Sequence, residues 1–204
     1  QIIDAHPRAT GAGALELLRQ IVRGLPQQTD GSRYPECLAA IDARTAQSLG
    51  RTYVNALAQH GRRAARIVDK FLTNYEHLGL VQSIVPNATV IHTHRDPRDA
   101  GLSCFMAALR PSWYPWSASL EDIGTFTLGY HRLMAHWREV LELEIHDIAY
   151  EEMVDDPPRQ TRRIIEACGL EWDDACLRFH ESPRTVTTLS YHQVRQPVYR
   201  DAVA

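Results

Sequence analysis

The stretch Val90-Ile-His-Thr-His-Arg-Asp-Pro-Arg-Asp-Ala-Gly-Leu-Ser103 determines how the rest of the chain is interpreted. The β-branched pair Val90–Ile91 follows a Pro-Asn turn and is typical of a buried strand. Asp96 is a good helix N-cap and Pro97 suits the first helical position, so a helix is predicted to begin here. The N–H groups of that helix terminus and the Arg95 guanidinium favour an anion site. An ordinary surface ion pair of Arg95 is the alternative.

Lysine usage gives a second signal. The chain has 22 basic residues, and Lys70 is its only lysine. It follows the short apolar run Ile67-Val68-Asp69 and is therefore predicted to lie at the end of a strand. Lysine carries a compact, flexible charge whose pKa can be tuned, and phosphate and sulfate chemistry commonly places such an amine on a bridging oxygen. A single retained lysine also arises by chance, so this count supports an anion-transfer site without proving one.

Composition limits the class of protein. With 204 residues and 44% hydrophobic content, the chain is expected to bury one core and to form a single domain over residues 1–204. The net charge of −3 creates no global field for nucleic acid or an anionic membrane, so neither is expected as a partner. No apolar run approaches the roughly 18 residues that span a bilayer. The four cysteines lack metal-type spacing and predict reduced thiols in a cytoplasmic setting.

Apolar periodicity predicts strands that alternate with helices, which is typical of a parallel α/β sheet covered on both faces. The expected strands are 66–69, 89–93 and 144–150. The expected helices are 2–22 (interrupted near 6–7 and 11–13), 36–59 (broken near 49–50), 74–85, 97–109, 120–141, 157–168 and 173–180. The aromatic segment 110–119 is predicted to be a loop or an acceptor-binding lid, and the tail from residue 182 is predicted to be extended. Three strands make a thin sheet, so at least one further strand is expected.

Several common motifs are absent from the sequence. No G-x-x-x-x-G-K-[ST] run exists, so an ordinary P-loop kinase has no direct support. Gly11-Ala-Gly13 lacks the third glycine and the preceding strand of a dinucleotide fingerprint. His92 and His94 alternate to one face of a strand and suggest a metal, but no motif supplies a third ligand, so no metal site is predicted.

At this point the residues resemble the sulfotransferases that use 3′-phosphoadenosine 5′-phosphosulfate (PAPS). Arg95 with Ser103 eight residues later resembles their 3′-phosphate-binding motif. The other matches follow in the order of the tyrosylprotein-sulfotransferase branch: Asp4-Ala-His-Pro7, Val68-Asp-Lys70 with Asn74, Tyr150-Glu-Glu-Met-Val154 with Pro157, and Ser190 with Gln193-Val-Arg-Gln-Pro-Val-Tyr199. The resemblance covers nearly the whole chain and is greatest to bacterial members.

The resemblance implies a three-layer, P-loop-like α/β fold with a central parallel sheet flanked by helices. In that family a strand and a glycine-rich 5′-phosphosulfate loop end just before the position that corresponds to Gln1. The first strand and the phosphate loop are therefore expected to be missing here, in a domain truncated at both ends. Because the bacterial relatives often carry tetratricopeptide repeats, such a domain is expected upstream in the full-length protein.

The resemblance also implies roles for single residues. Lys70 matches the catalytic lysine that contacts the transferring sulfuryl group, and Ser190 matches a serine that helps to hold the sulfonate. Arg95 and Ser103 match the 3′-phosphate pair, and Tyr150 matches the tyrosine that lines the adenine site. The remaining matches are Gln193, which begins the segment closing over the nucleotide, and Arg195, which adds charge near the 3′-phosphate.

Each role has a simpler alternative. The alternative for Lys70 is a surface lysine at a helix start, and the alternative for Ser103 is a helix serine bonded to its own helix. The alternative for Tyr150 is a tyrosine that only packs on the core. Ser190 and Arg195 read as solvated residues of a polar tail.

The general base is where the chain departs from the family. Related enzymes have a glutamate at the position of Ala14, and it accepts the proton of the acceptor hydroxyl. Glu16 is two residues further on, and two residues turn a helix by about 200°, to its opposite face. Three readings stay open: Glu16 serves as the base, the acceptor needs no strong base, or the activity is impaired. The arginines that bind acidic tyrosine peptides also have no counterpart after Leu17.

The sequence therefore predicts a sulfotransferase that moves a sulfuryl group from PAPS to a hydroxyl or similar group of a small-molecule or peptide acceptor. The product would be adenosine 3′,5′-bisphosphate (PAP), and no metal would be needed. A P-loop nucleotide kinase or other phosphotransferase is one alternative. A non-catalytic, PAP-binding module is the other, and the alanine at the base position motivates it.

Overall fold

The computed structural model describes residues 1–181 except 108, 110 and 111. Helices (α), 3₁₀ helices (η) and strands (β) follow one another as η1 (Ile3–Ala5), β1 (Ala9–Gly13), α1 (Leu17–Gln28), η2 (Glu36–Ala40), α2 (Ala43–Ala58), β2 (Arg66–Asp69), η3 (Asn74–His77), α3 (Leu78–Ile84), β3 (Val90–His94), α4 (Pro97–Met106), η4 (Pro115–Ala118), α5 (Leu120–Val140), β4 (Ile145–Ala149), α6 (Tyr150–Asp155), α7 (Pro157–Ala167) and η5 (Asp174–Glu181).

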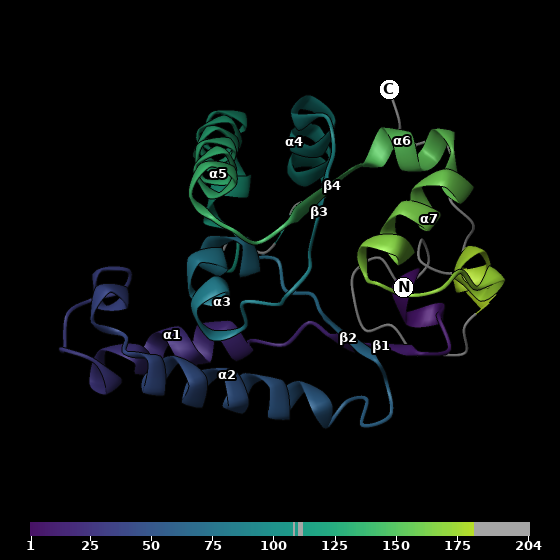
Figure 1. The fold of residues 1–204 in the computed structure, drawn as a ribbon. Coiled ribbons are helices and arrows are strands. Elements are labelled where there is room, and N and C mark those ends of the chain that lie inside the picture. Colours follow the sequence, from purple (N-terminus) through teal and green to yellow (C-terminus); the bar gives the residue numbers. More distant parts are fainter. Residues whose placement is uncertain (108, 110–111, 182–204) are drawn as a thin grey trace.

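The strands form two parallel pairs. β1 pairs with β2, and β3 pairs with β4 with His92 opposite Asp147. Figure 1 shows β3 and β4 close to α4 and α5, whereas β1 and β2 lie nearer to α1 and α2. Among the described residues no ladder joins β2 to β3. The predicted α/β class, with parallel strands flanked by helices, is confirmed, and the described strands form two sheets of two.

The N-terminal segment differs from its prediction. Residues 2–22 were expected to be helical, but the structure forms β1 at Ala9–Gly13 and starts α1 only at Leu17. Two glycines and a β-branched threonine make this run a poor helix former, and pairing with β2 satisfies its backbone groups instead. Gly13 has φ of 89°, a left-handed conformation that favours glycine, and the register shifts beside it. β1 is thus a strand that the sequence did not predict, and the first strand expected before Gln1 stays a prediction.

Helix α2 is the second difference. A break was expected near Leu49-Gly50, yet α2 runs unbroken through both residues. A Cβ on Gly50 would lie 2.1 Å from the Ile84 carbonyl oxygen, so the glycine lets α2 approach α3 closely. Glycine here serves helix–helix packing and does not end the helix.

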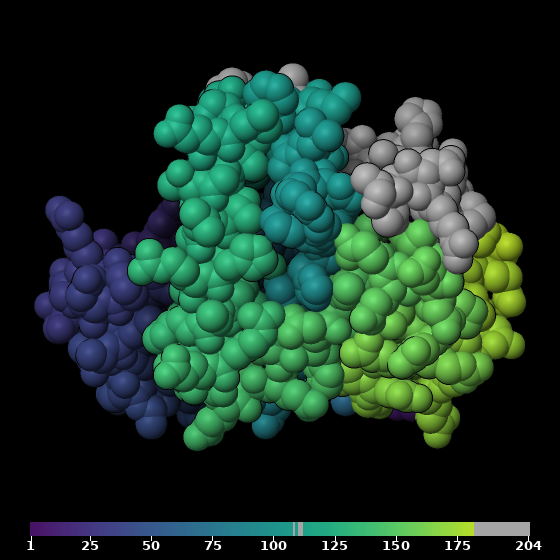
Figure 2. All heavy atoms as spheres, turned by 90° about the horizontal axis from the view of Figure 1, so that it is seen from above, coloured from purple at the N-terminus to yellow at the C-terminus, as the bar shows by residue number. Residues whose placement is uncertain are grey.

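Three apolar clusters hold the described elements, and the third contains Ile148, Met153 and Ile164. The larger apolar cluster joins α1, α2 and α3 through side chains such as Leu18, Leu25 and Leu80. Around α7, Ile165, Cys168 and Cys176 form a second cluster that also contains Ala9 of β1. The view in Figure 2 shows α5 and α4 side by side, with α6 and α7 beyond α4. This packing fixes the ends of the strands, where the predicted site residues lie.

Candidate functional site

Lys70 lies directly after β2. Its backbone N–H donates to the carbonyl of Gly13 at 3.2 Å, which brings the carboxyl ends of β1 and β2 together. The side chain is exposed, and no carboxylate among the described residues forms an ion pair with its ammonium. The lysine is therefore a mobile cation at a strand end, in the position where parallel α/β proteins bind anions.

Asp69, the residue before Lys70, is held by two side-chain hydrogen bonds. The carboxylate oxygen Oδ2 of Asp69 accepts from the Tyr53 hydroxyl at 2.7 Å and from Asn74 Nδ2 at 3.2 Å. Burial raises the pKa of Asp69, although both hydrogen bonds oppose the rise. Asp69 Oδ1, Thr73 Oγ1 and Asn74 Oδ1 are buried with no hydrogen-bond partner among the described residues. Buried polar atoms are normally bonded, so these three oxygens in and beside the turn after β2 are exceptions to the usual pattern.

Glu16 lies near this turn, and the helical argument against it was wrong. Residues 14–16 precede α1, with Glu16 at the N-cap position, so the 200° rotation does not apply. The Glu16 carboxylate pairs with Arg19 at 3.5 Å, and the Arg19 guanidinium lies 5.8 Å from the Phe71 ring centroid. The glutamate thus lies near the residue that follows Lys70 and is already paired with an arginine.

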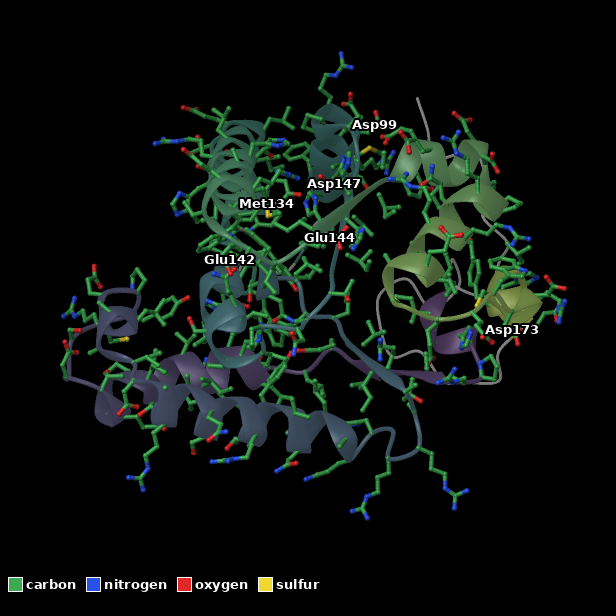
Figure 3. All side chains as sticks on the ribbon, viewed as in Figure 1. Asp99, Met134, Glu142, Glu144, Asp147 and Asp173 are labelled. Carbon is green, nitrogen blue, oxygen red and sulfur yellow. The ribbon has the colours of Figure 1, made fainter. Side chains whose placement is uncertain are left out.

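Arg95 lies at the end of β3. Its guanidinium donates to Asp99 at 3.2 Å and lies over the Tyr150 ring at 5.2 Å. Tyr150 begins α6 directly after β4, so the ends of two paired strands bring a cation and an aromatic face together. Figure 3 shows Asp99 on α4, on the side of that helix toward α6. A phosphate beside a stacked base is the kind of group that this pair suits.

The N-terminal amides of α4 are already bonded. The Asp96 side chain accepts from the amides of Arg98 and Asp99 at 2.9 and 3.4 Å, and Glu151 accepts from the Asp96 amide at 2.8 Å. The hydrogen bond from Arg98 lowers the pKa of Asp96 to about 2. Two carboxylates thus bind the amides that were expected to favour an anion, and the anion site at this helix end stays a prediction. Arg95 is the group at this end that retains anion-binding chemistry.

Ser103 is exposed on α4, two turns beyond Arg95. It is four residues after Asp99, so the two side chains share a helix face with Arg95 at its end. Within the described residues its hydroxyl makes no hydrogen bond, and the alternative of a serine bonded to its own helix is not observed. Ser190, Gln193 and Arg195 lie outside the described residues.

The predicted residues thus form two groups. Arg95, Ser103 and Tyr150 lie around the β3–β4 end, and Lys70 and Glu16 lie around the β1–β2 end. Among the described residues no ladder joins the two strand pairs that carry these groups.

Sequence reasoning missed a polar network between the groups. His92 Nδ1 lies 2.5 Å from Asp147 Oδ1, and His92 Nε2 is hydrogen-bonded to the Tyr130 hydroxyl. Arg138 donates to both Asp147 oxygens, at 2.7 and 3.2 Å. Figure 3 shows Asp147 on β4 beneath α4 and α5. The alternation of His92 and His94 was the available signal, but only strand register reveals the carboxylate opposite His92.

The electrostatics of the network define its protonation. Burial lowers the pKa of His92, although the bond to Asp147 opposes this, so the imidazole is neutral at pH 7. Burial alone would raise the pKa of Asp147, but the hydrogen bonds from Arg138 and His92 outweigh it and lower the pKa. The bonding pattern assigns the His92 proton to Nδ1, facing Asp147, and leaves Nε2 to accept from Tyr130.

In the aromatic segment, one tryptophan is packed and another is exposed. Trp116 lies in η4, and its ring stacks on the Phe126 ring with centroids 4.1 Å apart. Trp113 is 67% exposed. Within the described residues 112–119 the segment thus combines a packed Trp116 with an exposed Trp113, and its role as a lid stays a prediction.

Two general properties concern the described residues alone. No three His, Cys, Asp or Glu side chains gather there in a way that would hold a metal ion. None of the helices in the same residues combines the length and apolar character needed to cross a bilayer.

The fold and the sequence both match known proteins. The structure is similar to that of the sulfotransferase domain from the curacin biosynthetic pathway, with a TM-score of 0.65 over 97% of this chain and 77% of that chain, at 14% identity. The model of the Sulfotransferase family matches residues 1–174, and the chain belongs to that family. A protein of Aquifex aeolicus (strain VF5), described as uncharacterized, is 29% identical over 210 residues. The match covers 100% of this chain and 28% of that relative.

Proposed function

We propose that this chain is the catalytic domain of a PAPS-dependent sulfotransferase that acts on a hydroxyl group of a small-molecule or peptide acceptor. The observation that carries the proposal is the pairing of Arg95 with the Tyr150 ring at one strand end, together with Lys70 at another, which forms no ion pair among the described residues. A guanidinium next to an aromatic face suits a 3′-phosphate next to adenine. A separate ammonium suits the charged end of the nucleotide that reacts.

Bound PAPS would supply the activated sulfuryl group, and the residues described here would supply position and charge. Lys70 would donate a hydrogen bond to the oxygen that leaves with the phosphate and so stabilise its growing charge. Arg95 and Ser103 would hold the 3′-phosphate, and Asp99 would keep the guanidinium oriented. Positioning and electrostatics outweigh covalent chemistry in such transfers, as they do in phosphoryl transfer. The proposal places the protein in the cytoplasm, downstream of a tetratricopeptide-repeat domain, and requires no metal.

Nucleotide binding tests the proposal directly. Titration calorimetry on the full-length protein should show PAP binding that EDTA leaves unchanged. Arg95→Ala should weaken PAP binding about 10- to 100-fold, because a charge-assisted hydrogen bond contributes about 1.5–3 kcal/mol. Arg98→Ala is the matched control, since Arg98 is exposed and pairs with Asp96, and should change binding less than twofold. A preference for ATP with Mg²⁺ over PAP would instead support a kinase.

One observation favours a second candidate, a PAP-binding module without activity. Ala14 stands where related enzymes have the glutamate base. The two candidates separate on turnover: PAP release from PAPS, measured across a panel of phenols and alcohols, supports the enzyme. Tight PAP binding with no release across the panel supports the binding module.

A further inference from the structure

We propose that Asp147, His92 and Tyr130 form a proton relay whose outer end, the Tyr130 hydroxyl, accepts the proton of the acceptor hydroxyl. The inference rests on the proposed function and identifies the base that the sequence lacks at Ala14. It is carried by geometry, because a carboxylate, an imidazole and a hydroxyl from three elements are bonded in series.

The series has the right direction for proton transfer. His92 Nδ1–H donates to Asp147, which leaves Nε2 as the acceptor for Tyr130 O–H. A carboxylate that fixes the imidazole tautomer and stabilises the imidazolium is the arrangement by which histidine activates a hydroxyl. Arg138 keeps Asp147 ionised and held in place from α5. Each member therefore has the partner that its role requires.

The relay is also near the Lys70 turn. The Tyr130 ring meets the Tyr75 ring at 5.2 Å, and Tyr75 lies in η3, five residues after Lys70. Trp137 donates to the Tyr75 carbonyl at 2.7 Å and so fixes η3 on α5. Tyr130 thus connects His92, a half-buried residue of β3, with the segment that carries the proposed catalytic lysine.

The step balances as follows. The acceptor hydroxyl gives its proton to the Tyr130 oxygen as the Tyr130 proton passes to His92 Nε2. The acceptor oxygen forms its bond to sulfur, and the bond from sulfur to the phosphate oxygen breaks, with its electron pair leaving on PAP. The imidazolium, paired with Asp147, then returns the proton through Tyr130 to water.

The groups that face His92 set the pH dependence. They are His94, stacked at 5.5 Å on the same strand, Asp147 from β4, and Tyr130 and Arg138 from α5. Asp147 favours the imidazolium, whereas Arg138, His94 and burial oppose it. Turnover should therefore be constant near pH 7 and should fall as acid protonates His92, at a pH under the ordinary value of 6.5.

Tyr130→Phe on the full-length protein, with Tyr75→Phe as the control, tests the relay. PAP release from PAPS should fall about 10²-fold in Tyr130→Phe, with 2-naphthol or water as acceptor, because general base catalysis contributes about 10²–10⁴-fold. PAP affinity should be unchanged, and the acid limb of the pH profile should disappear. Tyr75→Phe removes a hydroxyl from the neighbouring half-buried ring and should stay within threefold. Equal loss in both variants, or an unchanged acid limb in Tyr130→Phe, overturns the relay.

A second readout does not depend on PAPS. Benzenesulfonyl fluoride should label Tyr130 at least about tenfold faster than Tyr75, as fluoride leaves sulfur and His92 takes the phenol proton. His92→Gln should remove the difference, measured by peptide mass spectrometry. Equal labelling of the two tyrosines overturns the relay even if the enzyme is active. A wild-type protein that binds PAP but never releases it from PAPS contradicts the proposed function, and the labelling rates still decide the relay.

Discussion

The cationic side chains at the two strand ends of this molecule have different surroundings. At the β1–β2 end Lys70 is exposed and forms no ion pair among the described residues, while the neighbouring Asp69 is half-buried and bonded. At the β3–β4 end Arg95 is held between Asp99 and the Tyr150 ring. A mobile lysine suits a charge that moves during a reaction, whereas an oriented arginine suits a charge that must stay in place. Under the proposed function, this difference suits transfer at the Lys70 end and anchoring at the Arg95 end.

Proton chemistry follows the same division. The β1–β2 end has alanine at position 14 and a glutamate at position 16 that already pairs with Arg19. Near the β3–β4 end, His92 is neutral and bonded between a carboxylate and a phenol. The predictions below test whether each end does what its side chains favour.

The largest expected effect is at Lys70. Lys70→Ala should lower kcat for PAP release by about 10²–10³-fold, which is the usual loss when one preorganised donor to a developing charge is removed. PAP affinity should change far less, because Arg95 still holds the 3′-phosphate. Lys70→Arg keeps the charge and should recover part of the rate. A kcat loss under threefold in Lys70→Ala would remove the division between transfer and anchoring.

A smaller effect is expected at Tyr53, whose hydroxyl donates to Asp69, the residue before Lys70. Tyr53→Phe removes a hydrogen bond to a buried carboxylate and should lower the free energy of unfolding by about 1–3 kcal/mol. Burial has raised the folded pKa of Asp69, so ionisation of this group costs stability at neutral pH. Loss of the Tyr53 bond raises that pKa further, and the destabilisation should be larger at pH 7 than at pH 4.

Denaturant titrations at the two pH values measure this difference. Tyr34→Phe is the control, because the hydroxyl that it removes is bonded to the His77 imidazole at 3.2 Å instead of to Asp69. A Tyr53→Phe variant whose destabilisation is the same at both pH values would show that the hydroxyl does not act through the ionised form of Asp69.

The smallest effect is expected at Ala14. Ala14→Glu restores the glutamate of related enzymes beside the Lys70 turn. If Tyr130 is the base, the change should alter kcat less than about threefold and leave the acid limb of the pH profile in place. A rise of tenfold or more would assign proton transfer to the β1–β2 end and would make the missing glutamate the cause of a low rate. Ala14→Gln, with the same size and no base, is the matched control.

Local sequence signals predicted much of the fold because those signals act over short range. Asp96 caps α4 and Pro97 begins it, as expected from their backbone preferences. The strand predicted at 66–69 is β2, and those predicted at 89–93 and 144–150 agree with β3 and β4 to within one residue at each end. The prediction of a helix within residues 2–22 was wrong where β1 forms. The small residues there have weak preferences, so tertiary pairing with β2 decided their structure. The prediction of a helix break near residue 50 was wrong because, in the sequence alone, a glycine that permits close helix packing cannot be distinguished from one that ends a helix.

By itself the sequence determined which chemical groups the protein has and the order in which they come: one lysine, an arginine after a buried strand, an alanine in the place of a base, and the motifs of a family. Only the tertiary structure decided which groups meet. Asp147 lies 55 residues from His92, and strand register alone puts them opposite each other. The same holds for Arg95 and Tyr150, which share a site because β3 and β4 run parallel and end together. Composition and spacing carry no record of register, because it is fixed by packing between segments far apart in the chain.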